Sequence, residues 1–429
     1  MLDWLAWGIH ALTAAAAIAV IRARRQGRIA SRWTPAETLI ALVCAAALLA
    51  LTSGPILIDY TKAYHYAGQA ILANPAALYD CTRAQCYVNL PIVALLFAPL
   101  GALEPYTAGV LFSLAGLVAL VFAARRLAAG RPFDTVMWLI LLNGPLYYSI
   151  RIGNTTHILL LVLLVAFERL SGTRERLAGA LLAFAALIKP PLGIFLLYLA
   201  ARGRFRAALT MAAAGAAVVL LSIALYGIDL HLFWFREFVM GHGSAPIAAY
   251  NVQSVNGFLA HLLTRGHLRD WYPIPMGSGF RAASLIVTGV IAAAAIAACW
   301  RAGRPRTPTA WLVELSLVLT ASVLIAPISW THYYLLLLIP IAGLLEARTW
   351  PDHWMAVLAL AGGVILISPP VVLLPFSGRI PAALYSRVLL SHYFYGGLLL
   401  LGVLIAARLR VAAVGEAASS ASMTERATD

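Results

Sequence analysis

The chain has 429 residues, of which 62% are hydrophobic and only 11% are charged. Soluble domains average about 45–50% apolar and about 25% charged residues, so this composition excludes an ordinary soluble protein and indicates an integral membrane protein. The net charge of +14 is what basic cytoplasmic loops produce in such a protein, and it gives no reason to expect a nucleic-acid partner.

The N-terminal part predicts apolar spans that alternate in direction. Residues 2–21 form a first span, and the five arginines that follow place its end in the cytoplasm. Residues 36–56 run outward to a polar external loop at 59–105, whose first part has helical apolar spacing and is expected to lie along the interface. Residues 91–103 are too short to cross a bilayer, so they are interpreted as re-entrant or interfacial.

A break follows the next three spans, which are predicted at 106–124, 134–149 and 158–167. Two short apolar halves, 177–187 and 191–200, flank Lys189 and a pair of prolines. They form either one proline-kinked span or a hairpin of two broken half-helices with Lys189 at its tip. Because arginines precede and follow the pair, the positive-inside rule favours the hairpin.

The C-terminal part continues the alternation, with a long external loop at 227–280. Its spans are predicted at 207–226, 282–300, 310–328, 334–345, 354–374 and 388–407. The sequence therefore predicts an all-α polytopic fold, with a single membrane domain over residues 1–410 and about 11–13 transmembrane or re-entrant helices. A disordered cytoplasmic tail is expected at 411–429. This topology puts 20 of the 31 basic residues in inner loops and 9 outside.

Two of the four cysteines, Cys81 and Cys86, lie in the first external loop. A disulfide between them is expected if the loop is outside the cytosol. A metal pair is disfavoured because no other cysteine lies nearby, and no external histidine has metal-ligand spacing. The sequence therefore predicts neither a metal site nor a cofactor.

A polar cluster begins where the second span ends, with Asp59 followed closely by Lys62, Tyr64 and His65. A carboxylate at the mouth of a membrane span is costly to hold, which makes Asp59 a candidate functional group. One well-placed carboxylate can act as a general base toward a hydroxyl group. The alternative is that Asp59 only caps the interfacial helix that follows it.

Lys189 is one of only two lysines in the chain, and it lies within an otherwise apolar stretch. An ionisable residue inside the membrane is a functional hypothesis by default, and its positive charge suits a phosphate group. The alternative is that its ammonium group reaches the interface along its own alkyl chain.

Other polar residues stand at predicted external ends of spans. His332 follows a Ser-Trp-Thr segment, and Asn251 and Gln253 offer amides suited to sugar hydroxyls. Arg151, Asn154 and His157 form a tight polar turn that is suited to contact a phosphate. Each has a structural alternative: an aromatic-belt position for His332, simple chain reversal for the turn, and a solvated loop surface for the amides.

These motifs occur in an order that resembles glycosyltransferase family 87, which belongs to the GT-C superfamily of polyprenyl-phosphate-sugar-dependent transferases. The resemblance covers about residues 36–350. It rests on the ordered set Asp59-Tyr60, Leu78-Tyr79-Asp80, Tyr87–Pro91, Gly153-Asn154, Leu187–Pro190, Asn251–Ser254 and Ser329–Tyr334. The chain departs from the family pattern where Tyr87-Val88-Asn89 replaces a frequent Tyr-Pro-Pro and Gly153-Asn154 a frequent Gly-Gln.

The resemblance implies a GT-C fold in a bacterial inner (plasma) membrane, with an active site facing the periplasm or exterior. It implies inverting transfer of a sugar from polyprenyl-phosphate mannose or arabinose to a lipid or glycan acceptor. In this scheme Asp59 is the catalytic base, and the donor phosphate is held by Lys189, Arg151 and His332. The sugar or the acceptor contacts Lys62, Tyr64, His65, Asn154, Asn251 and Gln253. The expected partners are the donor, a glycolipid or glycan acceptor and membrane lipid.

Two other classes share part of this pattern. A lipid-linked sugar transporter or flippase would also have broken helices and a buried lysine. It is disfavoured because no internal repeat is visible and the polar candidates cluster on one face. A polysaccharide ligase would use external arginines, whereas the arginines of this chain are mostly inside.

Overall fold

The computed structural model describes residues 2–29, 32–50, 55–82, 85–129, 134–172, 174–241, 245–264, 267–346, 353–371, 373 and 379–428. Within these ranges the chain is helical and has no strand beyond an isolated antiparallel bridge between Val252 and Trp330. Five of the described helices are long and apolar enough to cross a membrane: Pro105–Leu127, Phe205–Tyr226, Ser278–Arg301, Pro308–Ile325 and Pro381–Val411. The predicted all-α polytopic membrane fold is confirmed.

The elements before the first long external loop and within it are mostly short. They are α1 Leu2–Arg25, α2 Pro35–Ala50, the π-helical turn η1 Tyr60–Tyr64, α3 His65–Ala73, and the 3₁₀ turns η2 Pro75–Ala77, η3 Pro91–Leu96 and η4 Ala98–Leu100. As predicted, the segment at 91–103 does not span: η3 and η4 pack on α3 instead.

The middle of the chain contains two of the five long apolar helices, Pro105–Leu127 and Phe205–Tyr226. Its elements are α4 Pro105–Leu127, α5 Thr135–Leu141, α6 Asn143–Arg151, α7 Thr156–Ser171, α8 Glu175–Ile188, η6 Pro190–Gly193, α9 Ile194–Ala201, α10 Phe205–Tyr226, α11 Ile228–Trp234 and η7 Phe235–Met240. The C-terminal elements are α13 Val255–Leu263, α14 Ser278–Arg301, α15 Pro308–Ile325, η8 Thr331–Leu337, α16 Leu338–Glu346, α17 Trp354–Ile367, α18 Arg379–Arg387, η9 Leu389–Ser391 and α19 His392–Thr428.

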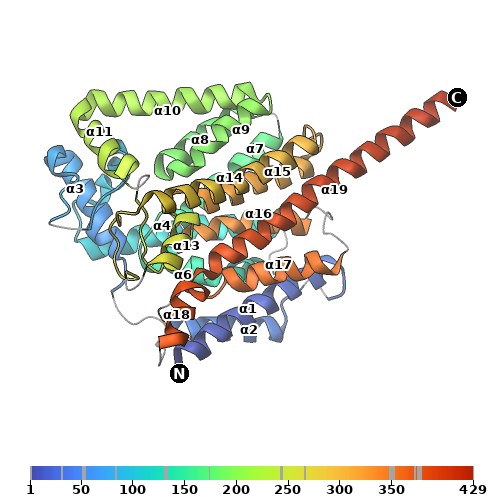
Figure 1. Ribbon diagram of the computed structural model, residues 1–429, viewed down its shortest axis with the longest axis horizontal. Helices are drawn as coiled ribbons and strands as arrows, with labels where there is room; N and C mark the ends of the chain where they lie inside the picture. The colour runs from blue at the N-terminus through green and yellow to red at the C-terminus, as the bar shows by residue number, and fades with distance from the viewer. Residues whose placement is uncertain are drawn as a thin grey trace.

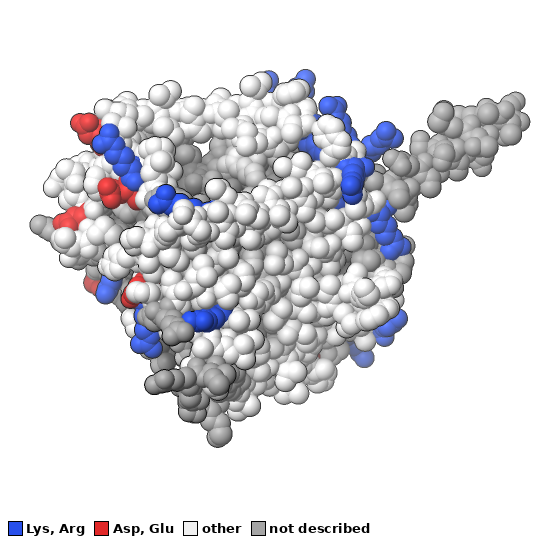
Figure 2. Space-filling view, in the orientation of Figure 1, with Lys and Arg blue, Asp and Glu red and all other residues white. Residues whose placement is uncertain are grey.

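Charge separates the two ends of the helix assembly. In Figure 1, α3 and α11 lie at one end and the C-terminal half of α19 leaves from the other. Figure 2 shows that the acidic side chains visible on this face all lie at the α3 and α11 end, while many Lys and Arg side chains gather where α19 leaves. This distribution matches the predicted alternation, in which arginine-rich ends are cytoplasmic.

The break around Lys189 is a hairpin. Arg204, just before α10, bonds Glu175 at the start of α8 through an Nη1–Oε1 contact of 2.6 Å. The chain therefore turns back after α8, so that the start of α10 lies beside the start of α8. In a single kinked span, Arg204 and Glu175 would lie at opposite ends. Gly179 lets α8 and α10 touch, because a Cβ there would lie 2.3 Å from the carbonyl oxygen of Ala207.

Buried ion pairs join helices at the predicted inner end. Arg24 of α1 contacts Glu37 of α2 at 2.7 Å and also bonds Asp134 next to α5. Glu314 of α15 accepts from Arg202 at 2.5 Å and from Arg408 of α19 at 2.6 Å. A buried charge is tolerated when it is paired in this way, so these carboxylates hold together the ends of distant helices that the sequence predicts to be cytoplasmic.

The structure differs from the predicted elements in two places. The span at 134–149 is divided into α5 and α6, because Pro145 has no N–H to continue the helix and crowds the preceding turn. The segment at 411–429 was expected to be disordered, but α19 continues to Thr428. Its many alanines have the highest helix propensity of any residue, and this favours the helical form.

Replacing Gly179 by Ala should loosen the hairpin that carries Lys189. The added Cβ must push α8 away from the α10 backbone, and overpacking of this kind costs about 1–3 kcal/mol. We expect a lower melting temperature for detergent-solubilised protein, measured by fluorescence-detected size exclusion after heating. Gly215→Ala in α10 is the matched control, since nothing lies within 4 Å of its Cβ position. Equal melting temperatures for the two variants would contradict the close packing of α8 on α10.

Candidate active site

Four interruptions of the helices meet at the end that the sequence predicts to be external. They are the turn before η1, the turn between α6 and α7, the break between α8 and η6, and the segment that joins α15 to η8. Three backbone bonds attach the first to the second: the N–H groups of Leu57 (2.5 Å), Asp59 (2.9 Å) and Tyr60 (3.2 Å) donate to the carbonyls of Arg151 and Ile152. Irregular backbone at this depth requires such protein partners.

The joint between the first two interruptions has an unusual backbone. Leu57 adopts φ +55°, a left-handed conformation that is costly for a branched residue and tends to occur at functional sites. Gly153 has φ +71°, and a Cβ there would lie 2.6 Å from Cβ of Tyr60. The glycine of the Gly153-Asn154 turn is thus required both by its conformation and by the close approach of η1.

Asp59 directs its carboxylate toward two amides. Asn154 donates from Nδ2 to Oδ2 of Asp59 (3.2 Å) and lies 3.1 Å from the hydroxyl of Tyr64. Gln85, in the loop closed by the Cys81–Cys86 disulfide, donates from Nε2 to Oδ1 at 3.2 Å. The carboxylate makes no capping hydrogen bond to η1. The capping alternative for Asp59 is therefore wrong, and the expected disulfide is present.

The environment of Asp59 disfavours its charged form. Burial of the carboxyl group raises its pKa above the usual value, while the amides of Asn154 and Gln85 and the charge of Lys189 act in the opposite direction. Burial prevails, so this carboxyl group is a better proton acceptor than an ordinary exposed aspartate. A raised pKa is a common property of carboxylates that act as bases.

Lys189 ends α8 at the tip of the hairpin and is only 4% exposed. Its Nζ lies 3.6 Å from the ring centroid of Tyr333, a cation–π contact. The ammonium group is also near enough to Asp59 for their charges to interact. It therefore stays inside the protein next to the carboxylate, and it does not extend to the interface as the alternative required.

His332 is buried beside the same lysine. Its ring packs edge-on against Tyr333, with the centroids 5.2 Å apart, and its charge would interact with those of Lys189 and His157. Nε2 of His332 has no hydrogen-bond partner among the residues that the structure describes. His332 thus lies close to Lys189 with one ring nitrogen open to a ligand, and its expected role in holding the donor phosphate stays a prediction.

His157 belongs to the polar turn with Arg151 and Asn154 that the sequence singled out as a phosphate contact or a chain reversal. Its Nδ1 lies 2.8 Å from Oγ of Ser149, and its Nε2 faces α4 where Gly116 has no side chain. A Cβ on Gly116 would lie only 1.8 Å from that nitrogen. The contacts of Tyr333 with Lys189 and of Gln85 with Asp59 were not predicted from the sequence. Tyr333 stood next to a predicted residue, but no sequence signal marked Gln85, because its contact with Asp59 spans 26 positions.

Asn251 and Gln253 contact the segment that carries His332. The N–H of Gln253 donates to the carbonyl of Ser329 (2.7 Å), and the N–H of Thr331 donates to the carbonyl of Asn251 (2.9 Å). The side chain of Asn251 accepts from Trp271 (3.0 Å), whereas that of Gln253 is buried and donates to Tyr250 (3.0 Å) and Leu390 (3.1 Å). These contacts position the 329–332 segment. Their expected role in binding sugar stays a prediction.

Arg151 is the predicted phosphate ligand with the least direct relation to this cluster. Its guanidinium carbon lies 5.5 Å from the ring centroid of Tyr147 on the same helix, and its backbone carbonyl holds Leu57. Its described contacts are with Tyr147 and Leu57, whereas the cation whose charge acts on the carboxyl group of Asp59 is Lys189.

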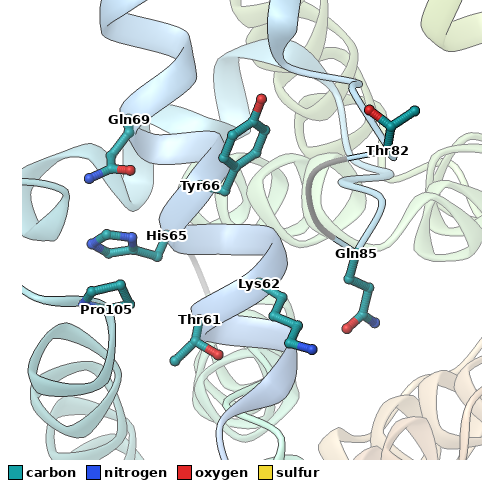
Figure 3. Close-up of a pocket in the computed structure, with 8 residues that line it drawn as sticks. All are labelled: Thr61, Lys62, His65, Tyr66, Gln69, Thr82, Gln85 and Pro105. Atoms are coloured by element: carbon teal, nitrogen blue, oxygen red, sulfur yellow. The ribbon is translucent and has the colours of Figure 1, made fainter.

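Lys62 and His65 border a separate pocket of about 460 Å³ beside Asp59. Figure 3 shows Thr61, Lys62, His65, Tyr66 and Gln69 on the helix formed by η1 and α3. Lys62 lies on the side of Thr82 and Gln85 of the disulfide loop, whereas His65 and Gln69 point to the other side, where Pro105 lies. His65 is buried, and its Nε2 lies 3.0 Å from the carbonyl of Leu103. Among the described residues, no group of three or more His, Cys, Asp or Glu side chains could hold a metal.

Comparison with known proteins gives two concordant results. A model described as "Glycosyltransferase family 87" matches residues 87–327, which is more than half of the chain. The chain is 26% identical over 348 residues to a Mycobacterium tuberculosis protein named polyprenol-phosphate-mannose-dependent alpha-(1-2)-phosphatidylinositol mannoside mannosyltransferase, covering 75% of this chain and 76% of the relative. It is 27% identical over 335 residues to a Mycolicibacterium smegmatis protein with a similar name, in which the acceptor is phosphatidylinositol pentamannoside; that match covers 72% of this chain and 77% of the relative. No solved structure matches.

Proposed function

The chain belongs to glycosyltransferase family 87, and from this we propose that it transfers a hexose from a polyprenyl-phosphate donor to a glycolipid at the external face of a bacterial inner membrane. Mannose is the sugar we favour, because both similar mycobacterial proteins are named for polyprenol-phosphate-mannose. The same names support a glycolipid acceptor. The charge distribution of Figure 2 supports an active site that faces away from the cytoplasm.

The observation that carries this proposal is the pairing of a carboxylate with one buried cation. Asp59 and Lys189 interact electrostatically across the meeting point of the interruptions. Transfer from a phosphate donor requires two things: a base for the acceptor proton, and positive charge where the leaving phosphate develops its own charge. Asp59 and Lys189 supply one each.

The step proceeds as an in-line displacement with inversion. The acceptor hydroxyl attacks the anomeric carbon, and its proton passes to the carboxylate of Asp59. The bond between the anomeric carbon and the phosphate oxygen breaks with its electron pair, leaving polyprenyl phosphate paired with Lys189. Nε2 of His332, which has no protein partner among the described residues, is available to hydrogen-bond the same phosphate.

A lipid-linked donor also needs a lateral route to the site. Figure 2 shows a hollow on the apolar face between α10 and α14. Both helices expose large aliphatic side chains, among them Leu209, Leu220, Leu285 and Ile286. A polyprenyl chain could lie there without leaving an apolar environment, while its phosphate reaches the tip of the α8–α9 hairpin.

Replacing Asp59 by Asn tests the base directly. The amide keeps the shape but cannot take the acceptor proton, so transfer of radiolabelled mannose from polyprenyl-phosphate mannose should fall about 10²- to 10⁴-fold. Asp229→Asn is the matched control, because this exposed external acid begins α11 away from Asp59 and should leave transfer unchanged. Full transfer by a properly inserted Asp59→Asn protein would exclude the mechanism.

Removing the charge of Lys189 should weaken recognition of the lipid phosphate. We expect Lys189→Met to require about tenfold or more polyprenyl phosphate for half-maximal product inhibition, since a charge-assisted contact is lost. Lys189→Arg, which keeps the charge, should recover part of the effect. Inhibition constants that do not differ between wild type and Lys189→Met would show that this lysine is structural.

The pH dependence of kcat/KM should report the carboxyl group of Asp59. The base works only when deprotonated, so activity should fall as the pH drops through its pKa, at a pH above that of an ordinary aspartate. Asn154→Ala removes a hydrogen bond that lowers this pKa, and it should move the acidic limb to higher pH. A shift to lower pH, or no shift, would contradict the assignment of that limb to Asp59.

A further inference from the structure

The pocket of about 460 Å³ beside Asp59 is not used by the mechanism above. It is formed by one face of the η1–α3 helix, by Thr82 and Gln85 of the disulfide loop, and by Pro105 at the start of α4. Its volume falls within the range of about 300–1,000 Å³ that is typical of small-molecule sites. Figure 3 shows that the residues lining it come from three separate segments.

The lining is chemically suited to a carbohydrate that bears negative charge. The hydroxyls of Thr61 and Thr82 and the amides of Gln69 and Gln85 each donate one hydrogen bond within the protein. Their oxygens, and the second N–H of each amide, remain for a ligand. Lys62 is the sole Lys, Arg, Asp or Glu in the lining, and it forms no ion pair with any described residue. Its ammonium group is exposed, so an incoming anion can reach it from the aqueous side.

A second external pocket has the opposite character. This pocket of about 450 Å³ is lined by apolar and aromatic groups together with Asp80 and Asp229, and its lining has no Lys or Arg. Two carboxylates would repel an anionic head group. The two pockets therefore differ in the charge they accept, and only the one with Lys62 suits an anion.

Gln85 joins the Lys62 pocket to the catalytic carboxylate. Its side chain lines the pocket and donates to Oδ1 of Asp59 at 3.2 Å. Lys62 follows Asp59 by three positions at the start of the same helix. A molecule in the pocket would therefore lie next to the base, on the aqueous side, while Lys189 occupies the buried side.

We propose that the pocket lined by Thr61, Lys62, Gln69, Thr82 and Gln85 binds the head group of the acceptor, and that Lys62 selects acceptors carrying a phosphodiester. This inference rests on the proposed function in that it assumes a saccharide acceptor. Two lysines then divide the charge recognition: the buried Lys189 contacts the donor phosphate and the exposed Lys62 the acceptor phosphate. Gln85 is a positioning residue shared by the pocket and the base.

The test is a binding titration that does not depend on transfer. Purified protein in detergent, without donor, is titrated calorimetrically with octyl mannoside and with octyl mannoside bearing a methyl phosphodiester at its 6-oxygen. Wild type should bind the phosphodiester more tightly than the neutral glycoside. In Lys62→Gln the affinity for the phosphodiester should fall about five- to tenfold, while the affinity for the neutral glycoside should not change. Added salt should reduce the preference for the phosphodiester over the neutral glycoside in the wild type only.

Arg236→Gln is the matched control, since it removes another exposed cation of the external face that lies outside the pocket lining. Equal phosphodiester affinity for wild type and Lys62→Gln would overturn the inference, as would equal losses in Lys62→Gln and Arg236→Gln. A parallel transfer assay separates the two proposals. Binding that depends on Lys62 without any transfer would reject the function and keep the site, whereas transfer with binding independent of Lys62 would do the reverse.

Discussion

Backbone that leaves its helix at membrane depth must find hydrogen-bond partners in the protein, because lipid offers none. In this chain that requirement brings four interruptions together at the end that holds Asp59. The N–H groups of Leu57, Asp59 and Tyr60 find their acceptors in the turn after α6, and the segment before η8 pairs with Asn251 and Gln253. The same joints that satisfy the backbone thus determine where Asp59 and His332 lie.

Buried charged side chains also need partners within the protein. At the inner end, Arg24 and Glu314 are centres of paired buried networks that tie together helices distant in sequence. At the outer end, Asp59 and Lys189 lie close without forming an ion pair within 4.0 Å in the described part of the chain. A tight salt bridge would neutralise both groups for catalysis. Separate partners, Tyr333 for the lysine and two amides for the carboxylate, leave each available to a substrate.

The two lysines of the chain differ in burial because they lie on different elements. Lys189 is buried at the tip of the α8–α9 hairpin, whereas Lys62 is exposed on the η1–α3 helix and lines the pocket of about 460 Å³. All other basic residues of the chain are arginines. The charge of Lys189 acts on the carboxyl group of Asp59, and Lys62 follows Asp59 by three positions. A compact ammonium group on a flexible stem suits a single phosphate oxygen that changes position during a reaction.

Composition and the spacing of apolar runs and arginines were sufficient to predict the membrane class, the helical fold, the hairpin around Lys189 and Asp59 as the leading candidate. These features are local: a span needs about 20 apolar residues, and an arginine marks its inner end wherever it occurs. The tertiary structure alone decided which distant groups meet. Gln85 reaches Asp59 across 26 positions, Asn154 across 95, and Lys189 reaches Tyr333 from another hairpin. Such contacts depend on how helices pack and where their backbones break, and no periodicity along the chain records that arrangement.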